Sequence, residues 1–185
     1  MQYWTKVDTL PMSKPAIFFD RDGVLNVDVG YLYKIEDFQW IDGAIEAIKY
    51  FNDKDYYVFV ITNQSGVARG YYKEEDINKL HNWMNQELAK HDAHIDEFFY
   101  CPHHSKGIIS EYSFECECRK PKTGMIQQAL EKYDINLSES FLIGDKDSDI
   151  ECAENKGIRY FLLKDNMVEI LNAISNATEL FVSMH

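Results

Sequence analysis

Three short stretches of the chain carry side chains suited to chemistry on a phosphate. Asp20 and Asp22 stand two residues apart in DRDG, TNQSG follows at 62–66, and DKDSD begins at Asp145. Clustered carboxylates suit Mg²⁺, a hard ion that prefers oxygen ligands. A bound Mg²⁺ neutralises phosphate, so that one aspartate can approach phosphorus as a nucleophile. A second aspartate can protonate the leaving oxygen and later activate water, so the pattern indicates phosphoryl transfer.

A parallel sheet would bring these three stretches together. Apolar runs of strand length are AIFF (16–19), YYVFVIT (56–62), EFFYC (97–101), SFLIG (140–144) and IRYFLL (158–163), with a weaker run, ELFV, at 179–182. Apolar stripes at helical spacing lie near 44–51, 74–90, 125–133, 150–157 and 167–174. This alternation predicts a Rossmann-like α/β fold, a parallel sheet buried between helices on both faces. Ligands bind beyond the carboxyl ends of such strands, and each polar stretch directly follows one.

Simpler interpretations of the same stretches are weaker. Asp-x-Asp-Gly after a strand can be a plain turn, and Thr and Asn commonly end strands. The segment 145–156 superficially resembles a calcium loop, but Ile150 stands where that loop needs Gly and Lys156 where it needs Glu. Three polar stretches, each at a strand end, together favour one shared site.

Length and charge narrow the class of protein. The 185 residues suit one domain, which we expect over 15–185 after an N-terminal tail at 1–14. The formal charge of -12 argues against a nucleic-acid partner. No apolar run is long enough to predict a membrane span, and the first residues lack the apolar core of a signal peptide. We therefore expect a cytoplasmic protein, a monomer that acts on a small phosphorylated molecule.

The segment CPHHSKGIISEYSFECECRKP, at 101–121, holds three of the four cysteines. In a reducing compartment, clustered cysteines suit metal binding or catalysis better than disulfides. Cys101-x-His103 and Cys116-x-Cys118 supply the ligands of a closed tetrahedral zinc site. The spacing is not the familiar C-x2-C, so ordinary reduced cysteines remain an alternative, as does His104 as the nitrogen ligand. Cys152 stands alone in a predicted helix and suits a buried apolar position.

Four motifs carry a resemblance to a known superfamily. FFDRDGVLN, ITNQSG, RKPKTG and IGDKDSD resemble, in order, those of the haloacid dehalogenase phosphohydrolases. DRDGVLNVDVGY, ITNQSGVARG and CPHH…CECRKPKTGM resemble one branch, the D-glycero-D-manno-heptose 1,7-bisphosphate 7-phosphatases. Histidinol-phosphate phosphatases are near relatives of that branch. The similarity extends over about residues 15–163.

The resemblance implies a role for each matching residue. Asp20 is the nucleophile that forms an aspartyl-phosphate, and Asp22 is the general acid and base. Thr62 and Lys120 hold the transferring phosphoryl group. The expected Mg²⁺ ligands are Asp20, the backbone carbonyl of Asp22, and Asp145. The expected structural Zn²⁺ ligands are Cys101, His103, Cys116 and Cys118. The substrate pocket is expected to be lined by Asp28, Gly30, Tyr31, Asn63, Gln64, Ser65, Arg119 and Lys146.

Several further expectations concern the residues and loops around the expected site. Asp149 is expected to orient the metal site, and Asp22 to lie beside a carboxylate cluster. His81 and the other histidines outside the zinc loop are expected on helix surfaces or in loops. The intervals that could hold a cap domain are too short for one, so we expect a minimal cap with a zinc-binding loop at 101–118. Zinc there would fix the position of Arg119 and Lys120.

The function implied is that of a Mg²⁺-dependent phosphatase that removes the 7-phosphate of D-glycero-D-manno-heptose 1,7-bisphosphate and leaves heptose 1-phosphate. That step belongs to the synthesis of nucleotide-activated heptose for surface polysaccharide such as lipopolysaccharide. One alternative is histidinol-phosphate phosphatase of histidine biosynthesis. Another, from a different class, is a zinc-stabilised interaction module that has lost catalysis.

Overall fold

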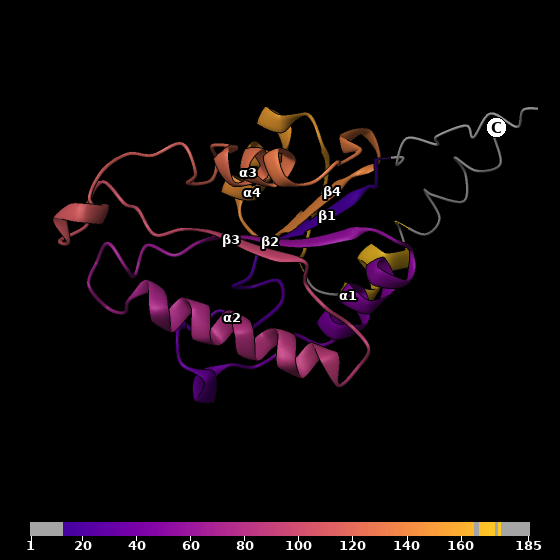
Figure 1. Cartoon of the computed structure of the whole chain (residues 1–185), viewed down its shortest axis with the longest axis horizontal. Helices are drawn as coiled ribbons and strands as arrows, with labels where there is room; N and C mark the ends of the chain where they lie inside the picture. The colour runs from indigo at the N-terminus through magenta and orange to yellow at the C-terminus, as the bar shows by residue number, and fades with distance from the viewer. Residues whose placement is uncertain (1–12, 165–166, 173, 175–185) are drawn as a thin grey trace, which may run out of the picture.

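A five-stranded parallel sheet lies at the centre of the molecule (Figure 1), in a computed structural model that describes residues 13–164, 167–172 and 174. The strands are β1 (Ala16–Phe19), β2 (Tyr57–Asn63), β3 (Glu97–Cys101), β4 (Phe141–Gly144) and β5 (Arg159–Leu162), in the spatial order β3-β2-β1-β4-β5. The predicted Rossmann-like sheet is therefore confirmed. The weak run at 179–182 and residues 1–12 of the predicted tail lie outside the described residues.

Helices cover both faces of the sheet. They are α1 (Ala44–Asp53), α2 (Glu74–Ala89), α3 (Gly124–Lys132) and α4 (Asp147–Lys156), with short 3-10 turns at Ile35–Asp37, Ser110–Tyr112 and Leu137–Glu139. In Figure 1, α3 and α4 lie above the sheet, and α1 and α2 lie below it. The helical residues 167–172 pack on the α1 and α2 side, where Met167 and Ile170 join the core. Among the described residues, no helix combines the length and apolar character needed to cross a membrane.

Alternate residues of β1 fill the two cores. Ile17 and Phe19 pack with α1 and α2, whereas Ala16 and Phe18 pack with α3 and α4. This two-sided burial explains why the sequence of a central strand is apolar throughout. The edge strands β3 and β5 differ from the expectation of full burial, because each has a neighbour on one side only and several of its residues are partly exposed.

Helix α4 begins at Asp147, before the apolar stripe that predicted it. The cause is capping: the Asp149 carboxylate accepts a hydrogen bond from the backbone N–H of Lys146 at 3.1 Å. The helix ends at Gly157, as predicted, in a left-handed conformation with φ of 74°.

The turn from β4 into α4 requires close packing of backbone on side chain. A Cβ atom placed on Gly144 would lie 2.2 Å from Cβ of Asp149. No side chain fits that distance, so glycine here lets the first turn of α4 lie directly against the strand end. The same contact fixes where the Asp149 carboxylate points.

We predict that Gly144→Ala destabilises the protein by at least about 2 kcal/mol, because the new methyl must displace α4. Gly157→Ala is a matched control that adds the same methyl where no atom lies within 4 Å. It should cost about 1 kcal/mol through its left-handed backbone alone. Urea unfolding measures both variants, and equal losses would contradict the prediction.

Candidate active site

Three carboxylates meet at the carboxyl end of the sheet. Asp20 follows β1, Asp145 follows β4, and Asp149 lies in the first turn of α4. One oxygen from each lies within 4.8 Å of the others. The Lys120 ammonium enters the cluster and lies 2.9 Å from Asp20 Oδ1 and 2.6 Å from Asp149 Oδ1. Its third contact is a hydrogen bond to the carbonyl of Ile61, at 2.8 Å.

The cluster is short of positive charge. Burial acts to lower the pKa of Lys120, but Asp20 and Asp149 more than offset it and leave the pKa raised. Burial raises the pKa of Asp145 to about 6, and the charges of Asp20 and Asp149 add to the effect. Asp145 Oδ1 is also buried without a hydrogen-bond donor among the described residues. Lys120 is the ammonium buried in the cluster, and the half-exposed Lys146 lies 3.8 Å from Asp145 Oδ2. Two ammonium groups facing three carboxylates leave room for a cation.

Mg²⁺ fits this donor set, because hard oxygen ligands surround an uncompensated negative charge. Asp20 and Asp145 would hold the ion, with the backbone carbonyl of Asp22, as the sequence predicted. Asp149 uses its second oxygen to accept hydrogen bonds from the backbone N–H groups of Asp145 and Lys146, at 3.2 and 3.1 Å. That arrangement suits its expected orienting role, since it ties the loop that carries Asp145.

The Asp22 carboxylate is surrounded by hydrogen-bond donors. This environment differs from the expected cluster of carboxylates. Arg21 Nη2 lies 3.0 Å from both carboxylate oxygens. Asn26 Nδ2 donates to Oδ1 at 3.0 Å, and Gln64 Nε2 donates to Oδ2 at 2.9 Å. Asp20 and Asp22 thus have separate cationic partners, Lys120 and Arg21.

Arg21 is a residue whose role the sequence analysis missed. Its side chain is fully buried, and it also donates to the carbonyl of Leu32 at 2.8 Å. An arginine placed between two aspartates directly after a buried strand was the available signal. The expectation for His81 was wrong: it is buried, stacks on Phe98 at 4.2 Å and lies 3.3 Å from Arg21 Nη1. Desolvation, with the Arg21 charge, lowers the pKa of His81 well below its usual value, so its neutral ring can face a guanidinium.

A small cavity, called the reacting cavity below, is lined by all four residues that were predicted to be catalytic. It has a volume of about 50 Å³ and is lined by Asp20, Asp22, Thr62, Asn63, Lys120, Lys146, Ser148 and Asp149. The Asn63 side chain makes two hydrogen bonds to the backbone of Lys120. It accepts one from the N–H at 3.0 Å and donates one to the carbonyl at 3.2 Å. The end of β2 thereby fixes the loop that delivers the ammonium.

Other predicted pocket residues are not in the lining of this cavity. Asp28 accepts from Lys146 Nζ at 3.1 Å, which ties the exposed loop after β1 to the site. Gly30 donates its N–H to Asp28 at 2.9 Å, and the exposed Tyr31 ring meets Tyr71 edge-on at 4.7 Å. Ser65 is half-buried in the loop after β2.

Gln64 differs from its predicted role as a substrate contact. Its side chain is 1% exposed. Its amide nitrogen donates to Thr62 Oγ1 as well as to Asp22, at 2.9 Å in each case. A substrate has no route to an amide enclosed in this way.

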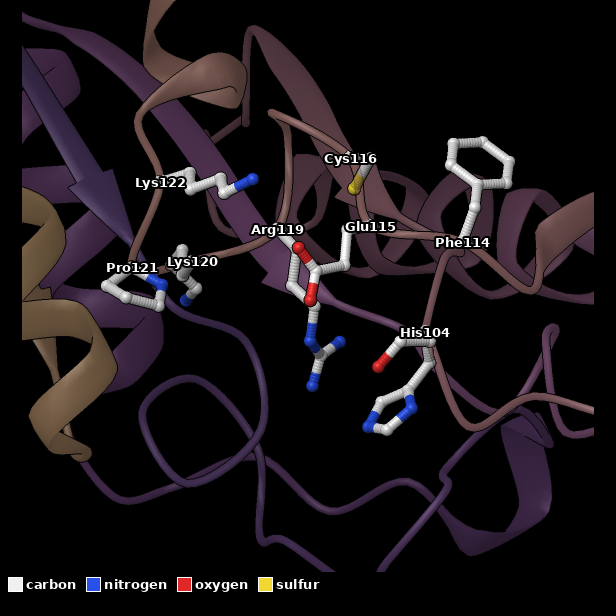
Figure 2. Close-up of a pocket in the computed structure, with 9 residues that line it drawn as sticks. His104, Phe114, Glu115, Cys116, Arg119, Lys120, Pro121 and Lys122 are labelled. Atoms are coloured by element: carbon white, nitrogen blue, oxygen red, sulfur yellow. The ribbon is translucent and has the colours of Figure 1, made fainter.

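Arg119 lies in a second, larger cavity of about 300 Å³ (Figure 2). Lys120 lines both cavities, so the two adjoin. In Figure 2 the Arg119 guanidinium and the His104 ring point the same way from the loop. Arg119 Nη1 also donates to the carbonyl of His103 at 3.4 Å, which links it to the cysteine segment.

The four predicted zinc ligands converge. The Sγ atoms of Cys101 and Cys116 lie 3.3 Å apart, and those of Cys116 and Cys118 3.1 Å apart. His103 Nδ1 lies 3.4 Å from Cys118 Sγ and 3.8 Å from Cys101 Sγ. Tetrahedral zinc, with bonds of about 2.0 to 2.3 Å, needs ligand atoms roughly 3.5 to 3.8 Å apart. The sulfur–nitrogen distances lie near this range and the sulfur–sulfur distances are shorter, so the donor set suits zinc once the thiols move slightly apart.

Thiolate chemistry in the cluster also suits a metal. Hydrogen bonds from Cys101 and its neighbours lower the pKa of Cys118 to about 5. The same hydrogen bond, with burial, raises the pKa of Cys101. The segment is tied to the catalytic end, since the carbonyl of Cys101 accepts from the N–H of Gln64 at 2.8 Å. Arg119 and Lys120 follow Cys118 directly, so an ordered cluster orders them.

A parallel sheet with paired aspartates after its central strand is the arrangement of the haloacid dehalogenase class of phosphohydrolases. Residues 117–170 match the family model described as "HAD-hyrolase-like". A putative HAD-like phosphatase from Mesorhizobium loti superimposes with a TM-score of 0.79 at 28% identity, covering 84% of this chain and 75% of that one.

Sequence relatives define the branch. The D-glycero-alpha-D-manno-heptose-1,7-bisphosphate 7-phosphatase of Photorhabdus laumondii is 47% identical, over 80% of this chain and 81% of the relative. The beta-anomer enzyme of Haemophilus ducreyi is 44% identical over 80% and 81%. The D,D-heptose 1,7-bisphosphate phosphatase of B. bronchiseptica, solved with magnesium and phosphate, has a TM-score of 0.71 at 32% identity and covers 80% of this chain and 79% of its own. The chain belongs to the heptose 1,7-bisphosphate 7-phosphatase family.

We predict that Cys118→Ser loses zinc, lowers thermal stability and lowers activity, because Arg119 and Lys120 lose their anchor. Cys152→Ser is the matched control, since that buried thiol lies outside the cluster and only donates to the carbonyl of Lys122. Metal analysis, thermal unfolding and phosphate release measure the three effects. Full activity in a zinc-free Cys118→Ser protein would contradict the anchoring role.

Proposed function

We propose that this chain hydrolyses the 7-phosphate of D-glycero-D-manno-heptose 1,7-bisphosphate to heptose 1-phosphate and inorganic phosphate. The carrying observation is the buried cluster of Asp20, Asp145 and Asp149 around Lys120, in a chain 43% to 47% identical to enzymes named for that reaction. The four free cysteines suit a reducing compartment such as the cytoplasm.

In the first step, a carboxylate oxygen of Asp20 attacks phosphorus. The bond between phosphorus and the sugar oxygen breaks, and its electron pair stays on that oxygen, which takes a proton from Asp22. The product is heptose 1-phosphate, and the phosphoryl group remains on Asp20. Lys120 and Thr62 face the same cavity, where they can hold the phosphoryl oxygens.

In the second step, Asp22 takes a proton from water as the water oxygen attacks phosphorus. The bond to Asp20 breaks, inorganic phosphate leaves, and both carboxyl groups return to their starting state. Bound Mg²⁺ would supply charge neutralisation for the phosphate throughout. Asp20 and Asp145 would hold it.

The second cavity favours a bisphosphate. Arg119, with Lys122 and His104, lines a space that adjoins the reacting cavity through Lys120. A second phosphate on the substrate would find a guanidinium there. Histidinol phosphate instead presents an amine and an imidazole, for which a guanidinium is a poor partner. The intact set of Asp20, Asp22, Thr62, Lys120 and Asp145 also speaks against an inactive zinc-stabilised module.

We predict that Asp20→Asn abolishes phosphate release, because the amide is no nucleophile. Asp22→Asn should slow release by about 100-fold or more while magnesium binding stays nearly intact. Phosphate assays and magnesium titration measure the two effects. Substantial turnover by Asp20→Asn would refute the covalent mechanism.

We predict that heptose 1,7-bisphosphate is a better substrate than histidinol phosphate in a panel measured with Mg²⁺. Arg119→Met keeps the stem but removes the guanidinium, so kcat/KM on the bisphosphate should fall about 10- to 100-fold. On p-nitrophenyl phosphate, which has no second phosphate, the same variant should keep most of its activity. A preference for histidinol phosphate would overturn the substrate assignment.

A further inference from the structure

We infer that Tyr72 is a positioning residue for the general acid, acting through the Gln64 amide on the Asp22 carboxylate. This inference rests on the proposed phosphatase function and deepens it. Tyr72 precedes α2, and it is not among the residues that line the reacting cavity. Its effect on catalysis must therefore pass through another side chain.

A continuous set of hydrogen bonds makes the connection. The Tyr72 hydroxyl donates to Gln64 Oε1 at 2.7 Å. Gln64 Nε2 then donates to Asp22 Oδ2 and to Thr62 Oγ1, each at 2.9 Å. All of these contacts are buried or partly buried, where a hydrogen bond is worth more than in water. Tyr72 itself is 6% exposed.

The hydroxyl decides which end of the Gln64 amide faces Asp22. An amide has two N–H donors and one carbonyl oxygen, and here every one has a partner. If the amide turned over, its oxygen would face the carboxylate of Asp22 and its nitrogen would face a hydroxyl. Without the Tyr72 hydroxyl, the buried carbonyl oxygen loses its donor and the preferred orientation weakens.

The Tyr72 side chain is held firmly enough for this task. Its ring stacks on Tyr33 at a centroid distance of 5.0 Å. A Cβ atom on Gly66 would lie 2.2 Å from Tyr72 Cε1, so the ring also lies directly against the backbone. Burial raises the pKa of Tyr72 to about 12, which keeps the proton that the hydroxyl donates.

Arg21 holds the other side of the same carboxylate. Its guanidinium contacts both oxygens of Asp22 and is itself fixed by the carbonyl of Leu32. Arg21 Nε adds a further contact to Asp22 Oδ1, at 3.2 Å. Gln64 and Asn26 approach from other segments and donate to the same carboxylate. The Tyr72 hydroxyl therefore affects the orientation of the Asp22 carboxylate and makes no link to the nucleophile Asp20.

The chemistry offers a selective readout. A sugar oxygen is a poor leaving group and needs the proton of Asp22 as its bond to phosphorus breaks. p-Nitrophenolate leaves without protonation. The value of kcat/KM covers the steps through departure of the leaving group, so a misaimed Asp22 lowers it for a sugar phosphate only. A fault of folding or metal binding would lower it for both substrates.

The test compares Tyr72→Phe with Tyr33→Phe, which removes the hydroxyl of the stacked partner ring that makes no contact with Gln64. Each variant is assayed with Mg²⁺ on p-nitrophenyl phosphate and on the alkyl phosphate that the wild type hydrolyses best. Tyr72→Phe should lower kcat/KM on the alkyl phosphate about 5- to 20-fold and stay within about 2-fold on the aryl phosphate, a fraction of the 100-fold or more supplied by a general acid. Tyr33→Phe should match the wild type on both. Gln64→Leu removes the amide and should show a larger loss on the alkyl phosphate, with a smaller loss on the aryl phosphate because Thr62 also loses its donor.

Equal losses of Tyr72→Phe on the two substrates, or no loss on either, would overturn the positioning role while the phosphatase function stands. Thermal unfolding of each variant accompanies the assays, and the isosteric Tyr72→Phe change keeps the test available if Gln64→Leu does not fold. A wild-type protein that releases phosphate from none of the substrates would overturn the proposed function and this inference together.

Discussion

A single ammonium buried among carboxylates is the interaction on which the site depends. Lys120 is nearly inaccessible to solvent, and so are Asp20 and Asp149. Burying any one of these charges alone would cost several kcal/mol, so the group is stable only as a set. The set comes from β1, from the loop before α3 and from α4. Correct folding of three distant segments is therefore a condition for assembling the charges at all.

The zinc segment and the strand ends share the task of placing that ammonium. Asn63, at the end of β2, holds the backbone of Lys120 on one side. The cysteine cluster ends two residues earlier, at Cys118, and begins at the end of β3. A metal bound there would join the edge strand β3 to the loop that carries Lys120. In Figure 1 the segment with the short helix Ser110–Tyr112 extends at the left, and hydrogen bonds from Ile108 and Ile109 to Ala68 and from Tyr112 to Glu74 tie it to the rest of the fold.

The sequence predicted the features that depend on neighbouring residues, and it predicted fewer of the contacts between residues that are distant along the chain. Strand ends, helix faces and the stop at Gly157 follow from apolar periodicity and backbone preference, and the carboxyl-end rule placed Asp20, Thr62 and Asp145 together. Burial of Arg21 and His81 could not be read in this way, because charged and polar residues look exposed until their partners are known. The link from Tyr72 to Gln64 joins two residues that lie outside any helix or strand, so periodicity gives no signal for it. The four possible zinc ligands were predictable from the sequence, whereas the hydrogen bond from the N–H of Gln64 to the carbonyl of Cys101 required the fold.

Two aspartates two residues apart differ in chemistry because their charged neighbours differ. Asp20 shares the Lys120 ammonium with Asp149 and belongs to the cluster that suits Mg²⁺. Asp22 faces Arg21 and two amides, none of which belongs to the metal cluster. The chain therefore supplies each carboxylate with its own cation from a different part of the fold, which suits the two roles proposed for them. One comes from a loop a hundred positions away, and the other is the residue between them. Because the partners are separate, the orientation of the Asp22 carboxylate can change without disturbing Asp20. We therefore expect the Tyr72 hydroxyl to affect protonation of the leaving group and not the attack by Asp20.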